Sequence, residues 1–263
     1  MQLRSSFLLF IPLALFLSGC LQIHTVVKVK PDGSGTIEES VAYGKSIAIL
    51  KEIFDDERDE QSELRDQSRS YGEGVSFISS SRVRTKDSRG HRVIYAFVDI
   101  NTLRLNQNPN RVVVSSGEKK AKSEGPKTKD EYVTFRFTKG QPARLMILMP
   151  QEDRATVTVR KDKRPKPQDE EGLDIARWLV GDLEVSTVVE VEGRVLESNA
   201  TFRKGSTITL LDINLDDLLT SEGFLEEASQ YEELSLRDAK TLMKKYPGIK
   251  VELNREVTVS FRK

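Results

Sequence analysis

The residues best suited to covalent or metal chemistry are scarce in this chain of 263 residues. It has one cysteine, Cys20, and two histidines, His24 and His91. A single thiol excludes an intramolecular disulfide and any zinc site built from several thiolates. Two histidines are too few for a multi-histidine metal site. His24 lies close to Cys20 and His91 lies beside a turn, so we expect both to be ordinary surface residues. We therefore expect neither a metal ion nor another cofactor.

Two short motifs resemble sequences that bind phosphate groups. Gly44-Lys45-Ser46 resembles the end of a P-loop, but the motif needs a glycine where this chain has Glu39. Asp55–Asp59 has the DDxxD spacing that binds magnesium diphosphate in prenyl-transferring enzymes. Those enzymes look all-helical and carry a second acidic motif, whereas Asp216-Asp217 lacks the third carboxylate. The acidic run is better interpreted as a solvated helix face.

A serine nucleophile is not supported either. The chain has no Gly-x-Ser-x-Gly elbow, and Gly33-Ser34-Gly35 lies inside a turn instead of between a strand and a helix. No group of residues forms a recognisable catalytic set. The sequence therefore predicts a protein that is not an enzyme and has no catalytic residues.

The first twenty residues, MQLRSSFLLFIPLALFLSGC, have the layout of an export signal. Arg4 supplies a positive charge, and an uncharged apolar run follows from Phe7 to Leu17. A run of this length suits a signal peptide, because a membrane-spanning helix needs about 20 apolar residues. We expect residues 1–19 to be removed from the mature protein.

Leu17-Ser18-Gly19-Cys20 resembles the lipobox of bacterial lipoproteins at all four positions. The resemblance implies cleavage between Gly19 and Cys20, a thioether-linked diacylglycerol on Cys20, and usually an acyl chain on the new amino terminus. Each buried methylene contributes about 0.8 kcal/mol, so two or three long chains anchor a protein stably. The only cysteine stands where lipidation needs it.

Composition and charge limit the partners of such a protein. Lys plus Arg and Asp plus Glu both number 41, which argues against a basic nucleic-acid-binding protein. Residues 1–19 hold only one charged residue, Arg4, so the mature chain has a formal charge of −1. The lipid is therefore expected to do the anchoring. Leu21 rather than Asp follows the cysteine, which in a Gram-negative cell would imply sorting to the outer membrane, facing the periplasm or the surface.

The first elements after the cysteine form a predicted β-hairpin over residues 22–43. Alternation around Ile23, Val27 and Val29 is typical of a strand, and Pro31-Asp32-Gly33-Ser34-Gly35 is a strong turn sequence. The returning strand places Ile37, Glu39, Val41 and Tyr43 on one face. With so short a tether, the folded domain should lie against the bilayer.

Further helices and strands are predicted along the chain. Helices are expected at 45–70, 173–180, 215–230 and 235–246. Strands are expected at 75–84, 91–100, 132–138, 144–149, 155–159, 185–196 and 207–213, with a final strand or hairpin at 249–253 and 257–261. This pattern predicts an α+β fold, with antiparallel or mixed sheets, an N-terminal hairpin and three to four packed helices.

Two polar segments divide this pattern. Residues 115–131 have no apolar period and predict a mobile insertion. Residues 160–172 are charged, contain two prolines and predict a linker. We therefore expect α+β regions at 20–159 and 173–263, which could also form one continuous domain.

Asp-Ile-Asn occurs twice at a strand end, at 99–101 and 212–214. Either the two copies form a duplicated corner facing a ligand, or they are a recurrent strand-to-helix turn. The turn is the favoured interpretation, because Asp and Asn cap helices readily.

Residues 22–43 and 187–214 resemble bacterial lipoproteins of the LppM-like family. The similar features are the hairpin turn at 31–36 and the strand that leads into Asn199-Ala200-Thr201. The resemblance implies an α/β domain exposed at the cell envelope, without an agreed biochemical activity. Several such proteins have a C-terminal membrane helix, whereas this chain ends in a charged strand at Arg262-Lys263.

The leading hypothesis is a non-enzymatic lipoprotein of the cell envelope, held to a membrane by its N-terminal lipid. It would act by binding an envelope protein or lipid, or play a structural role. The alternative is a periplasmic carrier of lipid or another small ligand, with a pocket between sheet and helices.

Overall fold

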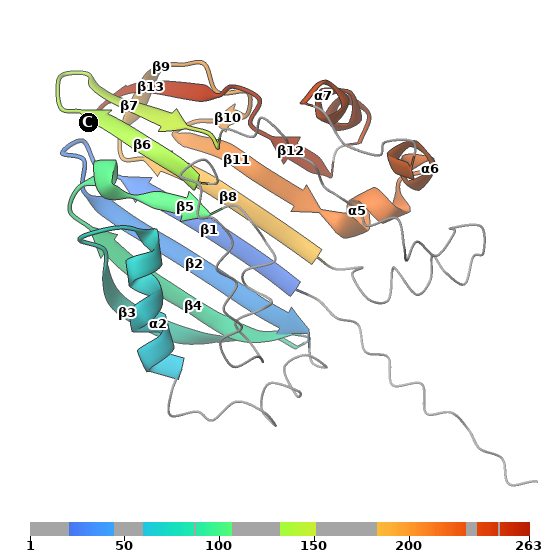
Figure 1. Cartoon of the computed structure of the whole chain (residues 1–263), viewed down its shortest axis with the longest axis horizontal. Helices are drawn as coiled ribbons and strands as arrows, with labels where there is room; N and C mark the ends of the chain where they lie inside the picture. The colour runs from blue at the N-terminus through green and yellow to red at the C-terminus, as the bar shows by residue number, and fades with distance from the viewer. Residues whose placement is uncertain are drawn as a thin grey trace, which may run out of the picture.

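The computed structural model describes residues 21–44, 60–86, 88–106, 132–150, 183–229, 236–246 and 248–263. These residues form thirteen strands in two sheets. The large sheet has eight strands in the order β10-β11-β8-β1-β2-β4-β3, with β12 also paired to β11, and the small sheet has the order β5-β6-β7-β13-β9. Figure 1 shows the small sheet packed over one end of the large one.

The strands of the large sheet are β1 (Leu21–Val29), β2 (Gly35–Gly44), β3 (Ser76–Arg84), β4 (Ser88–Phe97), β8 (Leu183–Val191), β10 (Arg203–Lys204), β11 (Thr207–Asn214) and β12 (Ile249–Val251). The small sheet holds β5 (Arg104–Asn106), β6 (Tyr132–Thr138), β7 (Ala143–Leu148), β9 (Arg194–Ser198) and β13 (Glu256–Arg262). Helical segments are α2 (Glu60–Ser68), η1 (Arg69–Tyr71), η2 (Ile100–Thr102), α5 (Leu215–Thr220), α6 (Phe224–Ser229) and α7 (Leu236–Lys245).

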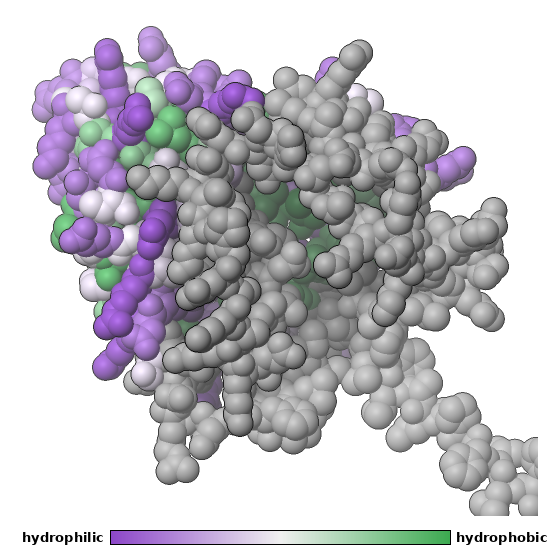
Figure 2. Space-filling view, in the orientation of Figure 1, coloured by the Kyte–Doolittle hydropathy of each residue, from purple (hydrophilic) through white to green (hydrophobic). Residues whose placement is uncertain are grey.

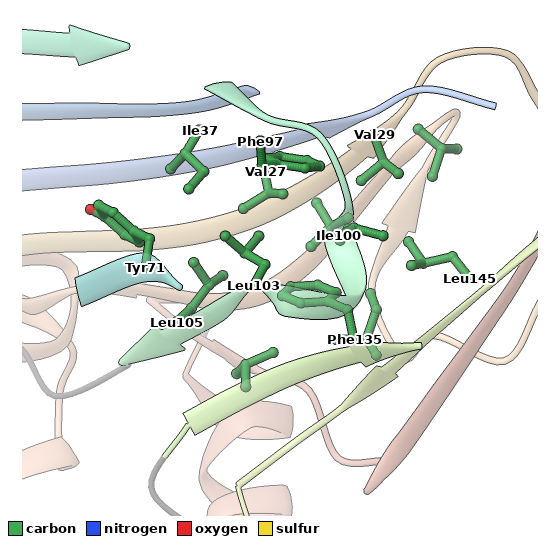
Figure 3. Close-up of a cluster of buried hydrophobic side chains, with 14 of the residues drawn as sticks. Val27, Val29, Ile37, Tyr71, Phe97, Ile100, Leu103, Leu105, Phe135 and Leu145 are labelled. Carbon is green, nitrogen blue, oxygen red and sulfur yellow. The ribbon is translucent and has the colours of Figure 1, made fainter. Parts of the chain in front are cut away.

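The predicted α+β fold with three to four packed helices is wrong, because the two sheets pack on each other. Side chains from both sheets fill the main core, and ten of its residues are labelled in Figure 3. Val27 and Ile37 come from the large sheet, and Phe135 and Leu145 from the small one. The described α-helices are six to ten residues long, and α5 and α7 pack into a separate cluster. The described helices are therefore short elements added to a core that the two sheets form.

The N-terminal hairpin is observed as predicted. β1 and β2 pair without interruption from Leu21 opposite Tyr43 to Val29 opposite Gly35. A Cβ on Gly35 would lie 1.9 Å from the carbonyl oxygen of Lys28 and 2.6 Å from the Phe97 ring. Only glycine therefore allows the aromatic ring to lie over the strand at this point.

The predicted strand at 185–196 is two strands in different sheets. β8 ends at Val191 in the large sheet, and β9 begins at Arg194 in the small sheet. Between them, Gly193 has φ +135°, and a Cβ there would lie 2.3 Å from the carbonyl oxygen of Arg262. The last two strands also belong to different sheets. β12 joins the large sheet and β13 the small one, so they do not form a hairpin.

Other predicted elements differ in extent. The helix predicted at 215–230 is broken into α5 and α6 near Gly223, which has φ +78°. Of the helix predicted at 45–70, only α2 and η1 lie within the described residues. The predictions at 1–20, 55–59, 115–131, 155–159, 160–172 and 173–180 lie outside them. Both sheets contain strands from before and after 160–172.

The two Asp-Ile-Asn segments both begin helical turns. The Asp99 side chain accepts a hydrogen bond from the Asn101 N–H at 2.9 Å and starts η2. In the second copy it is Asn214 that accepts from the Asp217 N–H, at 3.1 Å, and starts α5. Because different members of the triplet act as the cap, the two are strand-to-helix turns and not a duplicated ligand corner.

Candidate functional site

The inner face of the large sheet, which packs against the small sheet, also holds a row of polar side chains. Successive side chains of a strand alternate between faces, so the odd-numbered residues of β1, β2 and β8 share this face. Thr25 lies opposite Glu39 on one side and beside Thr187 on the other. Glu39 and Thr187 are only 6% and 7% exposed. A carboxylate this deep in a sheet needs donors to offset its lost hydration.

Two donors from the helical segment beside the sheet reach Glu39. The Tyr71 hydroxyl of η1 donates to Glu39 Oε2, and Gln67 Nε2 of α2 donates to Oε1 at 3.0 Å. Each carboxylate oxygen thus has its own partner. These two hydrogen bonds help to hold α2 and η1 against the sheet.

Tyr95 extends this cluster with an unused hydroxyl. Its ring centroid lies 5.2 Å from that of Tyr71 and 6.2 Å from that of Phe77. The side chain is fully buried, and its hydroxyl has no hydrogen-bond partner among the described residues. An unpaired buried hydroxyl is costly and is uncommon in folded proteins. We call Glu39, Gln67, Tyr71 and Tyr95 the carboxylate cluster.

Both tyrosines of the carboxylate cluster resist ionisation. Burial, and then the charge of Glu39, raises the pKa of Tyr71 well above its ordinary value of 10.0. The same two causes, in the same order, raise the pKa of Tyr95. Both hydroxyls therefore stay protonated in the folded protein at pH values where they ionise in the unfolded chain.

We expect the free energy of unfolding to fall as the pH rises above about 10, the pKa of an unfolded tyrosine. Above that pH the unfolded chain has lost protons that the folded one keeps, so stability falls with pH. The slope should be about 1.4 kcal/mol per pH unit for each tyrosine. Urea unfolding between pH 8 and 11.5 measures it. Tyr71→Phe/Tyr95→Phe should give a flatter profile, and parallel profiles would contradict the assignment.

An apolar shelf continues the inner face beyond the polar row. Its buried members are Ile23, Val41, Tyr43 and Val185, and Leu21, Leu183 and Leu211 pack against them. All of these come from the large sheet, and none of the shelf's described members belongs to the small sheet. In Figure 2, hydrophobic side chains are visible in the middle of this view of the molecule. The inner face thus passes from core to polar row to shelf.

A shallow pocket of about 370 Å³ lies beside the carboxylate cluster, lined by Arg65, Ser68, Phe77 and Ile78. The Arg65 guanidinium lies 5.8 Å from the centre of the Phe77 ring. Phe77 in turn contacts Tyr95. Phe77 therefore both lines this pocket and contacts the Tyr95 ring of the carboxylate cluster.

The residues considered in the sequence fall elsewhere. Gly19 and Cys20 lie outside the described residues, and β1 starts directly after them at Leu21. His24 is on the outer face, where its Nδ1 shares a 2.7 Å hydrogen bond with Ser186 Oγ, and Glu184 lies 4.0 Å from its Nε2. A serine beside a histidine could suggest a nucleophile, which would need backbone N–H groups as oxyanion donors. Around Ser186, the backbone of β8 is instead paired with β1 on one side and with β11 on the other. The sequence missed the carboxylate cluster, although Glu39 stood among the apolar residues of one strand face.

Asn199-Ala200-Thr201 proves to be part of a structural clamp. Glu252, 4% exposed, accepts hydrogen bonds from the Thr201 N–H at 2.8 Å and its hydroxyl at 2.6 Å. The same carboxylate accepts from the N–H groups of Leu253 and Asn254 at 2.9 and 2.8 Å. These four bonds hold the segment where the chain passes from β12 to β13.

Within the described ranges, no three His, Cys, Asp or Glu side chains are grouped to hold a metal ion. Among the same residues, no helix is both long and apolar enough to span a bilayer.

No protein-family model matches the chain, and no curated protein matches its sequence. Its structure is similar to the NMR structure of the folded domain of LppM from Mycobacterium tuberculosis, at 11% identity and a TM-score of 0.35. The alignment covers 95% of each chain. A likeness at this level supports no conclusion about function.

Proposed function

We propose that the chain is a bacterial envelope lipoprotein, anchored through a lipid on Cys20, that acts by binding and not by catalysis. The observation that carries the proposal is the position of β1, which begins at Leu21 and lies in the interior of the large sheet. One residue spans about 3.5 Å, so a lipidated Cys20 would place the end of that sheet at the membrane surface. The proposal includes sorting of the lipoprotein to an outer membrane only if the cell is Gram-negative.

The engagement of the buried acids argues against their use in catalysis. Glu39 is occupied by Tyr71 and Gln67, and Glu252 is occupied by four donors. A general acid or base must exchange a proton with a substrate within hydrogen-bond reach. Both carboxylates instead spend their acceptor capacity on holding the fold together.

The anchor is tested by separating lipidation from export. The wild-type chain should incorporate a labelled fatty acid and float with membranes. Residues 21–263 exported behind an ordinary secretory signal should take up no label and stay in the soluble fraction. This comparison avoids Cys20→Ala, which blocks processing and leaves the signal peptide as a second anchor. Unlabelled wild-type protein, or an exported body that still floats, would refute the proposal.

A second candidate function is the binding of an amphiphile. The apolar shelf could hold an acyl chain, and the adjoining polar row with the Tyr95 hydroxyl could hold a polar head. Mass spectrometry of a solvent extract from detergent-free protein should then find one amphiphile per chain. Tyr95→Phe, which removes only the unpartnered hydroxyl, should lower that amount, and an extract without lipid would exclude this function.

A further inference from the structure

The tip of the β3–β4 hairpin concentrates positive charge in a chain whose total charge is balanced. Arg82, Arg84, Lys86 and Arg89 are all exposed, and we call them the basic tip. The only acid between residues 82 and 92 is Asp87. Arg92, slightly further from the tip, is already paired with Glu38 at 2.6 Å.

Strand register places the basic tip at the same end of the large sheet as the proposed anchor. Leu21 lies opposite Tyr43, Tyr43 opposite Arg89, and Arg89 opposite Arg84. These residues form one row across four neighbouring strands. With about 4.8 Å between strands, Arg89 lies roughly 10 Å and Arg84 roughly 14 Å from β1. Any surface that reaches Cys20 therefore comes close to the tip.

Like charges face each other in this hairpin. Arg84 is directly opposite Arg89 on the same face, and such pairs of equal charge destabilise a sheet. Two other basic residues of the large sheet lie next to acids: Lys28 lies 3.7 Å from Glu38, and Lys250 lies 2.6 Å from Asp212. The Arg84–Arg89 pair places two positive charges side by side at the end of the sheet where the chain would meet a membrane.

We propose that the basic tip binds the anionic headgroups of the membrane that holds the lipid anchor. Guanidinium groups form paired hydrogen bonds with phosphate, and basic residues are attracted to anionic lipid within about a Debye length. A lipid on Cys20, next to the first residue of β1, fixes one point and leaves the body free to rotate. A second contact three strands away fixes the angle of the large sheet to the bilayer. This inference rests on the proposed lipidation of Cys20.

The tip can be probed in the full lipidated protein, because lipidation consumes the only thiol of the chain. A spin label on Lys86→Cys reports the collision rate with a neutral, water-soluble nickel complex. The matched control is Lys139→Cys, another exposed lysine position next to Thr138 at the end of β6. That end lies by the β1–β2 turn, because the Phe137 side chain adjoins Gly33.

In vesicles with one third anionic lipid, the collision rate at position 86 should be at least threefold lower than in zwitterionic vesicles. The rate at position 139 should be the same in both. Adding Arg84→Gln, or raising the salt to 0.5 M, should return the rate at position 86 most of the way to its zwitterionic value. Equal rates at position 86 in the two vesicle types would overturn the proposal. Protein that floats with neither type would instead refute the lipid anchor.

Discussion

Glu252→Leu should lower the free energy of unfolding by about 4 kcal/mol, because it removes the carboxylate that accepts hydrogen bonds from the Thr201 hydroxyl and three backbone N–H groups. The leucine has a similar volume, so loss of packing contributes little. The clamp lies where the chain passes between the two sheets, from β12 to β13. Urea unfolding followed by far-UV circular dichroism measures the change.

Glu256→Leu is the matched control, since Glu256 is an exposed residue at the start of β13. Its substitution should change stability by no more than about 0.5 kcal/mol. Glu252→Gln should fall between the two, because an amide keeps one acceptor oxygen and turns an NH₂ group toward the remaining donor. A Glu252→Leu protein within 1 kcal/mol of wild type would show that the clamp does not stabilise the fold.

The second large effect is a difference in sign between two tyrosines of the carboxylate cluster. Tyr71→Phe removes the donor to Glu39 Oε2 and leaves a buried carboxylate oxygen unpaired, at a cost of about 2 kcal/mol. Tyr95→Phe removes a buried hydroxyl that has no partner among the described residues, so stability should stay the same or rise by about 1 kcal/mol.

Each of these two variants controls for the other, because both delete one oxygen from rings that lie side by side. Both substitutions keep the aromatic ring and its contacts, so any change in packing should be similar in the two variants. Denaturation midpoints measured together should therefore move in opposite directions, or only that of Tyr71→Phe should move. Equal losses in both would contradict the hydrogen-bond assignment.

Apolar alternation and turn residues in the sequence identified individual strands well. β6 has the predicted bounds, and the β1–β2 hairpin follows from its Pro-Asp-Gly turn. These local patterns could not predict which strands pair with each other or to which sheet each strand belongs. Nothing local to Val191 and Arg194 shows that the chain changes sheets between them, since a strand pattern does not reveal its neighbours. The residue between the two strands must be glycine because the backbone carbonyl of Arg262, far away in sequence, lies against Gly193.

Part of the candidate site could likewise be predicted from the sequence pattern. Glu39 interrupts an apolar face, and that alternation can be read from β2 by itself. Tyr71 and Gln67 could not be assigned to it, because they reach Glu39 only once α2 and η1 dock on the sheet. The charge of the basic tip was hidden by the balanced total, and its meaning depends on the register that aligns Arg84 and Arg89 with Leu21.

The parallel pairing of β1 with β8 has a consequence for biogenesis. His24 and Ser186, which meet across this pair, are 162 residues apart in sequence. Whether it is being synthesised or exported, the first strand waits until its partner follows, and at synthesis rates of about 5–20 residues per second that wait is roughly 8–30 seconds. During that time one edge of the hairpin exposes unpaired amide groups beside valines. We expect a chain paused before residue 183 to need a holding chaperone, and to aggregate in its absence.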